Sequence, residues 1–220
     1  MPRSAVIYTS PDAFAGLKEE ARRKFAHLPL KPYTFSYGQR TDAGSVRVRV
    51  TEVLDGALAQ EWVRLVERGE ATPASSADRD VRRRTFEELM ADADRARREA
   101  CLQLVSPTIV EVNAQALPFP VFPVIFEQYI AAWNTFSDAL IGPWKDGLDH
   151  VRVTDFRISC VASPFGPGSQ GWVKLEMEKG RTEGEIGLFN ALLDFAFYCG
   201  TGLHTEEGLG QTRRMERGAK

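Results

Sequence analysis

A glycine-rich segment near the C-terminus is the part of this chain that is best suited to hold a ligand. Its four glycines, Gly200, Gly202, Gly208 and Gly210, form two Gly-x-Gly pairs directly after the apolar run 186–198. Glycine adopts positive φ angles and leaves backbone N–H groups uncovered. Because successive uncovered N–H groups can bind an anion, the spacing predicts a phosphate-binding loop. A helix C-cap followed by turn glycines is the simpler interpretation, but it explains only Gly200.

Three histidines, His27, His150 and His204, are the candidates for proton transfer, since imidazole titrates near neutral pH. His204 lies inside the glycine-rich segment, where it could contact a phosphate or be a solvated loop residue. His150 precedes a strand-like run, and we expect it to be structural or exposed.

Basic residues could supply contacts to a phosphate backbone. Arg47 and Arg49 alternate with valines in the run 45–53, so they are predicted to share one face of a strand. That face could bind a polyanion or could simply be solvated. Arg213 follows the glycines, and four more arginines cluster within residues 79–84. Contacts of this kind position a nucleic acid without reading its bases.

The composition limits the classes of function. The 220 residues are 43% hydrophobic and carry a formal net charge of −2, so any site for a polyanion must be a local patch. Three widely spaced cysteines without a C-x-x-C pair favour reduced thiols and argue against a structural zinc. The sequence also contains pairs of acidic residues that are direct neighbours, and such side chains point apart on a helix or strand, so no metal site is predicted. No signal peptide or membrane span is apparent, so we expect a cytoplasmic protein without a membrane partner.

The hydrophobic periodicity predicts an α+β protein built from two units. In the second unit, the order β-α-β-β-α-β comes from strands at 101–112, 151–162, 172–177 and 209–215 and helices at 120–136 and 186–198. The first unit can be read in the same order, which is the ferredoxin-like pattern. The sequence therefore predicts tandem ferredoxin-like (RRM-like) domains with a C-terminal glycine-rich loop. The first domain is expected at residues 1–78, and the second, preceded by a charge-rich linker helix at 85–100, within residues 79–220.

Six segments together resemble one known family. They are Lys31-Pro-Tyr-Thr-Phe-Ser36, the run 46–55, Thr85-Phe-Glu-Glu-Leu89, Leu104-Val-Ser-Pro-Thr108, Ala132-Trp-Asn134 and the glycine-rich loop followed by Gln211. In this order, over nearly the whole chain, they resemble the CRISPR repeat-processing endoribonucleases, the sixth Cas family of the RAMP superfamily.

The resemblance implies binding of the repeat RNA in precursor CRISPR transcripts and a single cut beside the repeat hairpin, without a metal or other cofactor. The 2′-hydroxyl of the RNA would attack the neighbouring phosphate and leave a 2′,3′-cyclic phosphate and a 5′-hydroxyl. Such chemistry needs a base, an acid and positive charge at the phosphorane. The resemblance carries the acid–base role onto His27 and the phosphate-stabilising role onto Lys31, and it implies RNA contacts for the glycine loop with His204.

The resemblance leaves three points open. A tyrosine that some family members carry on the first helix has no counterpart within residues 11–26. A CRISPR effector complex and a second copy of the chain remain open as further partners. A non-catalytic RAMP-type subunit that only holds guide RNA, and an unrelated ferredoxin-like protein that holds another phosphate, are the alternative functions.

Overall fold

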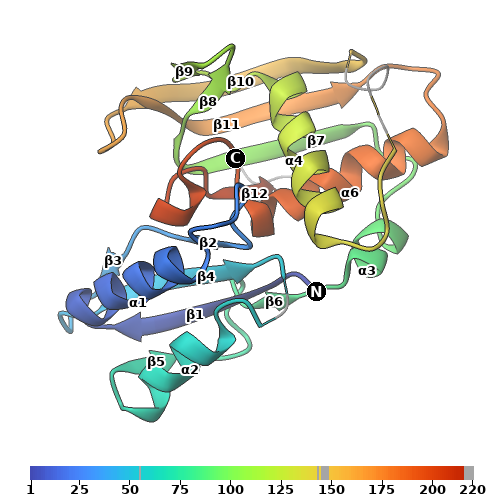
Figure 1. Ribbon diagram of the computed structural model, residues 1–220. Helices are drawn as coiled ribbons and strands as arrows, with labels where there is room; N and C mark the ends of the chain where they lie inside the picture. The colour runs from blue at the N-terminus through green and yellow to red at the C-terminus, as the bar shows by residue number, and fades with distance from the viewer. Residues whose placement is uncertain (55, 143, 145–148, 216–220) are drawn as a thin grey trace.

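The computed structural model describes residues 1–54, 56–142, 144 and 149–215, which form two units that each place helices against an antiparallel sheet (Figure 1). The first unit contains β1 (Arg3–Thr9), α1 (Pro11–Lys24), β2 (Tyr33–Phe35), β3 (Gln39–Arg40), β4 (Val46–Glu52), α2 (Ala59–Glu67), β5 (Ala71–Pro73) and β6 (Arg82–Arg83). Its sheet has the order β2-β4-β1-β5, with β3 paired to β4 and β6 paired to β1.

Two features of the first unit bear on the site. The valines of β4 are buried with Leu17 and Ala21 of α1, so alternation turns the arginines of β4 to the opposite face of the sheet. Strand β6 pairs with β1, which brings residues 82–83 into the first sheet, beyond the domain end expected at residue 78.

The second unit contains α3 (Phe86–Ala91), β7 (Glu99–Thr108), β8 (Val110–Val112), β9 (Gln115–Leu117), α4 (Phe122–Phe136), β10 (Val151–Val161), β11 (Gly168–Met177), α6 (Glu183–Cys199), the 3₁₀ helix η1 (Thr205–Glu207) and β12 (Thr212–Met215). Its sheet has the order β10-β11-β7-β12, and β8 and β9 form a separate hairpin. Large aromatic side chains of α4 and α6, among them Trp133, Phe189 and Phe195, are fully buried in its core.

The α+β class with two antiparallel sheets is confirmed. The order β-α-β-β-α-β describes the first unit apart from its short strands β3 and β6, and the second unit apart from α3, η1 and the β8–β9 hairpin. The prediction of a linker helix over residues 85–100 is wrong about where the helix ends. A capping box between Thr85 and Glu88 starts α3 as expected, but the helix ends at Ala91. The chain from Glu99 onward pairs with β11 instead, because a strand in a buried sheet gains more than a charge-rich helix does from propensity. No helix within the described parts of the chain is long and apolar enough to cross a membrane.

Buried polar bonds join the two units. The hydroxyl of Thr51 on β4 donates to the carbonyl oxygen of Tyr198 on α6 at 2.7 Å. The side-chain amide of Gln211 donates to the carbonyl oxygen of Phe35 at 2.9 Å and to the hydroxyl of Thr34 at 3.1 Å. The glycine-rich loop and β12, red in Figure 1, lie between the units. These bonds fix the loop against the first sheet.

Candidate nucleic-acid interface

His27 lies in the turn that follows α1. The helix begins at the N-cap Ser10 with Pro11 in its first turn and ends at Phe25, whose N–H donates to the carbonyl oxygen of Ala21. The imidazole of His27 is exposed. The Lys31 ammonium donates to the carbonyl oxygens of Phe25, at 2.9 Å, and of Leu28. Lys31 therefore holds the loop on both sides of His27, which leaves an accessible imidazole on a fixed segment of backbone.

The loop that carries His27 lies beside the glycine-rich segment. Lys31 and Thr205 line the same small cavity of about 40 Å³, together with Gln128 and Cys199. The carboxylate of Glu207 in η1 forms ion pairs with Lys18 and Arg22 of α1. The fold thus brings together two regions that are nearly the whole chain apart in sequence.

The glycine-rich loop does not offer the open N–H groups that its sequence predicts. The N–H groups of Gly200, Gly202, Gly208 and Gly210 donate to Ala196, Gln128, Thr205 and Pro107, respectively. All four glycines are buried and have positive φ angles. The expectation that these glycines form an open anion-binding nest is therefore wrong, because the N–H groups of all four already have acceptors inside the protein.

The glycines instead permit close backbone packing. A Cβ added at Gly202 would lie 2.1 Å from the carbonyl oxygen of Ile109, and one at Gly210 would lie 1.9 Å from that of Thr201. Real Cβ atoms do not approach an oxygen so closely, so these two positions can hold only glycine without a backbone shift. These glycines allow the loop to pack closely between β7 and the first unit.

His204 has a different position from the glycines around it. It adopts a left-handed backbone conformation with φ of 58°. Its ring stacks on Phe165, which lies between β10 and β11, with ring centroids 4.1 Å apart and planes 17° apart. The stack joins the β10–β11 hairpin to the glycine loop, and the His204 side chain is half-buried.

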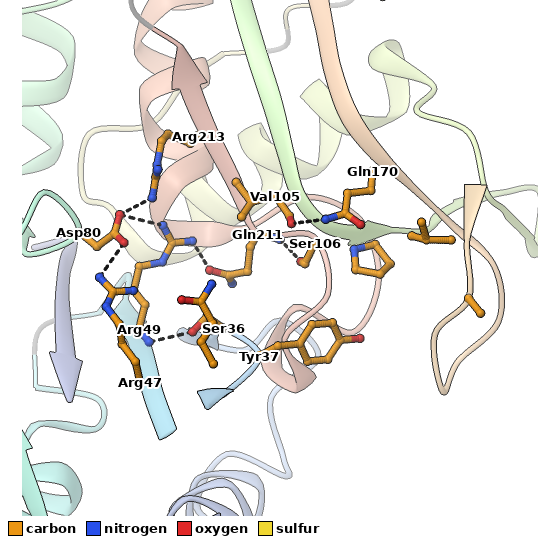
Figure 2. A pocket seen from close by; sticks show the side chains of 14 residues that line it. Ser36, Tyr37, Arg47, Arg49, Asp80, Val105, Ser106, Gln170, Gln211 and Arg213 are labelled. Carbon is orange, nitrogen blue, oxygen red and sulfur yellow. Dashed lines mark hydrogen bonds and ion pairs between the residues drawn. The ribbon is translucent and has the colours of Figure 1, made fainter. Parts of the chain in front are cut away.

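A cavity of about 350 Å³ opens between the two sheets (Figure 2). Arg47, Arg49 and Arg213 line it, so the structure brings these three predicted residues together. Other lining residues supply hydroxyl, amide and aromatic groups: Ser36, Tyr37, Gln39, Ser106, Gln170 and Gln211. This combination of guanidinium groups, amides and one aromatic ring is suited to an RNA strand.

Asp80 lies among the three arginines of the cavity. Its carboxylate pairs with Arg47 at 3.0 Å and with Arg213, and one oxygen lies 4.0 Å from Arg49. Burial raises the pKa of Asp80, but the hydrogen bond from Arg47 and the charges of Arg213 and Arg49 outweigh burial and hold the pKa below its ordinary value. Asp80 is therefore an ionised counter-charge where a phosphate could bind.

Arg49 is not part of an open stripe. Only 4% of its surface is exposed. Its guanidinium donates to the side-chain oxygen of Gln211 and lies 4.3 Å from the centroid of the Phe197 ring. Burial lowers the pKa of Arg49 to about 10, although Asp80 opposes the shift. Arg49 lines the cavity from a buried position, whereas Arg47 is half-buried and the more accessible of the two.

The comparison with protein families decides the identity of the chain. The family model described as CRISPR-associated endoribonuclease Cas6 matches residues 102–212 of the 220. The chain belongs to the Cas6 family. The resemblance stated from the sequence is thereby confirmed. A search of curated protein sequences found no match.

Solved Cas6 structures share the fold over nearly the full length. A Cas6 product complex is 20% identical, with a TM-score of 0.78, over 98% of this chain and all 100% of the other. A Cas6 substrate-mimic complex is 20% identical, with a TM-score of 0.78, over 97% of this chain and 99% of the other. Thermus thermophilus Cas6 is 20% identical, with a TM-score of 0.75, over 98% of both chains. At such identity the likeness supports the fold.

Sequence reasoning missed Asp80 and the stack between Phe165 and His204. Asp80 stands in a polar segment without periodicity, so no local signal sets it apart from Asp78. Nothing in the hairpin turn 163–167 indicates a contact with a residue some forty positions later. His150, which the sequence predicts to be structural or exposed, is half-buried, and its ring nitrogen pairs with Glu178 at 2.9 Å. Among the described residues, no three or more His, Cys, Asp or Glu side chains gather as a metal site.

Proposed function

We propose that the protein is a repeat-specific, metal-independent endoribonuclease that cuts precursor CRISPR RNA by attack of the RNA's own 2′-hydroxyl. The products are guide RNAs with a 2′,3′-cyclic phosphate on one side of the cut and a 5′-hydroxyl on the other. Membership in the Cas6 family of endoribonucleases is the observation that carries this proposal.

His27 acts as the general acid or base in this proposal. Its exposed imidazole can reach a substrate, and Lys31 fixes the loop that presents it through two backbone carbonyls. The Lys31 ammonium also places a positive charge beside His27, where it can stabilise the dianionic phosphorane. His204 contacts the RNA from the glycine loop. Gly200, Gly202, Gly208 and Gly210 serve RNA binding indirectly, because they hold that loop in place.

The cavity between the sheets binds the RNA backbone. In the protein alone, Arg47 pairs with Asp78 and Asp80, and Arg213 pairs with the other carboxylate oxygen of Asp80. A phosphate would bind these guanidinium groups in competition with the two carboxylates. Arg49 supports the cavity from its buried position and keeps Gln211 in place. This arrangement predicts a binding affinity that falls steeply with salt concentration.

The test is cleavage of the cognate repeat RNA in EDTA, followed by analysis of the product ends. We expect specific cleavage with a cyclic phosphate at the new 3′ end. A repeat with a 2′-deoxy sugar just upstream of the cut should bind and stay intact. Cleavage of the deoxy substrate, or activity that requires Mg²⁺ or Mn²⁺, would contradict the mechanism. Binding without any cleavage would support the alternative of a non-catalytic RNA-binding subunit.

A further inference from the structure

The open face of the second sheet carries a tryptophan, Trp172, that the proposed mechanism does not use. Helices α4 and α6 cover the other face of this sheet (Figure 1), where Val173 and Leu175 of β11 are buried in the core. Because side chains alternate along a strand, Trp172 points away from these helices. Its side chain is only half-buried there. A large aromatic group that is partly open to solvent on a sheet face is suited to bind a flat partner.

Trp172 belongs to a row of four side chains, one from each strand of this sheet. The register places Trp172 opposite Arg157 of β10 on one side and opposite Gln103 of β7 on the other. Gln103 in turn lies opposite Arg213 of β12. Residues directly opposite each other share a face, so the order across the sheet is Arg157, Trp172, Gln103, Arg213. The row combines one aromatic ring with an amide and two guanidinium groups.

The row is suited to an anionic ligand. Arg157 is exposed, and no ion pair joins it to any other residue that the structure describes. The neighbouring row differs, because Lys174 lies there opposite Asp155 and pairs with Glu99 at 3.0 Å. The charge of Lys174 is thus already compensated within the protein. An anion on this face is therefore attracted to the row of Trp172 more than to the row beside it.

The row also continues the surface that we assign to the RNA backbone. Gln103 and Arg213 line a wide groove together with Arg47 and Asp80. Arg47, Asp80 and Arg213 line the cavity between the sheets as well, so the groove and the cavity adjoin. A strand of RNA that leaves the cavity past Arg213 meets Gln103 and then Trp172.

We propose that Trp172 stacks one unpaired base of the repeat RNA, while Arg157 and Arg213 hold phosphates on either side of that base. This inference rests on the proposed RNA-binding function and names a residue that contacts a base. Single-stranded RNA stacks its bases on aromatic side chains, so the bound nucleotide lies outside the hairpin. The order of charge, ring and charge matches the order of phosphate, base and phosphate along a nucleotide chain, which an acidic protein segment lacks.

Binding of the full chain to a panel of repeats, each with one abasic nucleotide, tests the stack. Trp172→Ala should weaken binding of the unmodified repeat by about 5–150-fold, the scale of one base–aromatic stack. One abasic position should weaken wild-type binding to a similar extent and should cause no further loss in Trp172→Ala, since the two changes remove the same contact. Trp172→Phe keeps an aromatic ring and should stay within about threefold of the wild type.

Phe156→Ala is the matched control on the same sheet. Phe156 is an aromatic residue that is 53% exposed, but it lies opposite the buried Val173 and so belongs to the other face. Phe156→Ala should bind the repeat as the wild type does. An equal loss of affinity in Phe156→Ala and Trp172→Ala would overturn the assignment of the base to the open face.

Fluorescence gives a second measurement that does not depend on the folding of Trp172→Ala. A base stacked on Trp172 should quench part of the wild-type tryptophan fluorescence when the repeat binds, and Trp172→Phe should lack that part. A wild type that binds and cuts the repeat, but shows no abasic position coupled to Trp172 and the same quenching as Trp172→Phe, would overturn the stack and leave the proposed function standing. A wild type without affinity for any repeat would overturn both. Wild-type affinity in Trp172→Ala would also overturn the stack and leave this face open to a protein partner.

Discussion

Gly202→Ala separates a structural role of the glycine loop from a direct role in RNA binding. Gly202 is buried with φ of +81°, and an added Cβ would lie 2.1 Å from the carbonyl oxygen of Ile109. The backbone must move away. That movement breaks the bond from the Gly202 N–H to Gln128 and the bond from the Leu203 N–H to the same Ile109 carbonyl oxygen, both 2.8 Å long. The loop would then no longer pack against Ile109, directly after β7.

The magnitude follows from these losses. A non-glycine residue at positive φ costs about 1–3 kcal/mol, and each lost hydrogen bond costs about 0.5–1.5 kcal/mol net. Gly202→Ala should therefore lower the free energy of unfolding by about 2–6 kcal/mol, out of a total of about 5–15 kcal/mol for an ordinary domain.

Gly180→Ala is the matched control. Gly180 is exposed, has φ of +84° and has nothing within 4 Å of an added Cβ. Gly180→Ala should lose only the conformational part of the free energy of unfolding, about 1–3 kcal/mol, without the two lost hydrogen bonds. Urea unfolding, followed by tryptophan fluorescence, measures the free energy of unfolding of both variants. Equal stability losses in the two variants would refute the packing role. A Gly202→Ala protein of wild-type stability that no longer binds repeat RNA would return the loop to direct RNA binding.

Three further predictions concern the cavity and the loop. Arg47→Ala should weaken repeat binding and reduce the slope of log K against log salt by about 1, as for a lost phosphate contact. The control is Arg68→Ala, at an exposed residue just after α2, which should change neither the affinity nor the slope. An unchanged slope for Arg47→Ala would remove Arg47 from the interface. Because the folded pKa of Asp80 lies below its ordinary value, its stabilisation is full above about pH 4 and is lost as the pH falls through the lower folded value. Asp80→Asn should therefore reduce stability most near neutral pH and approach the wild type in acid; a stability difference that does not shrink in acid counts against this assignment. Phe165→Ala removes the stack on His204 and should cost about 0.5–1.5 kcal/mol in urea unfolding, and a variant as stable as the wild type would show that the stack contributes nothing.

The strands with strict alternation could be predicted from sequence because burial of one face requires it. The valines of β4 enter the core and the arginines leave it, as the pattern of the run 45–53 predicts. What the pattern could not show is the surface that the arginines face. The second unit covers it, so Arg49 became a buried residue bonded to Gln211, 162 positions later in the chain.

For the glycine loop, the sequence predicts the backbone conformation but not the contacts. Its sequence predicts conformational freedom correctly, since all four glycines have positive φ angles. Whether their N–H groups are open depends on acceptors that lie far away in sequence, such as the side chain of Gln128 and the carbonyl oxygen of Pro107. No local pattern encodes these acceptors. Asp80 escaped notice for the same reason, because its role comes from three arginines contributed by β4 and β12.

The single-turnover rate of His27→Ala on cognate repeat RNA, measured in EDTA, tests the central claim most directly. The variant should cleave about 10²–10⁴-fold more slowly than the wild type, the usual scale for loss of a general acid or base, while repeat affinity stays nearly unchanged. His150, whose ring pairs with Glu178, has no part in the proposed mechanism, so His150→Ala should cleave at the wild-type rate. A His27→Ala protein that cleaves as fast as the wild type would contradict the account, and loss of cleavage in His204→Ala alone would move proton transfer to the glycine loop.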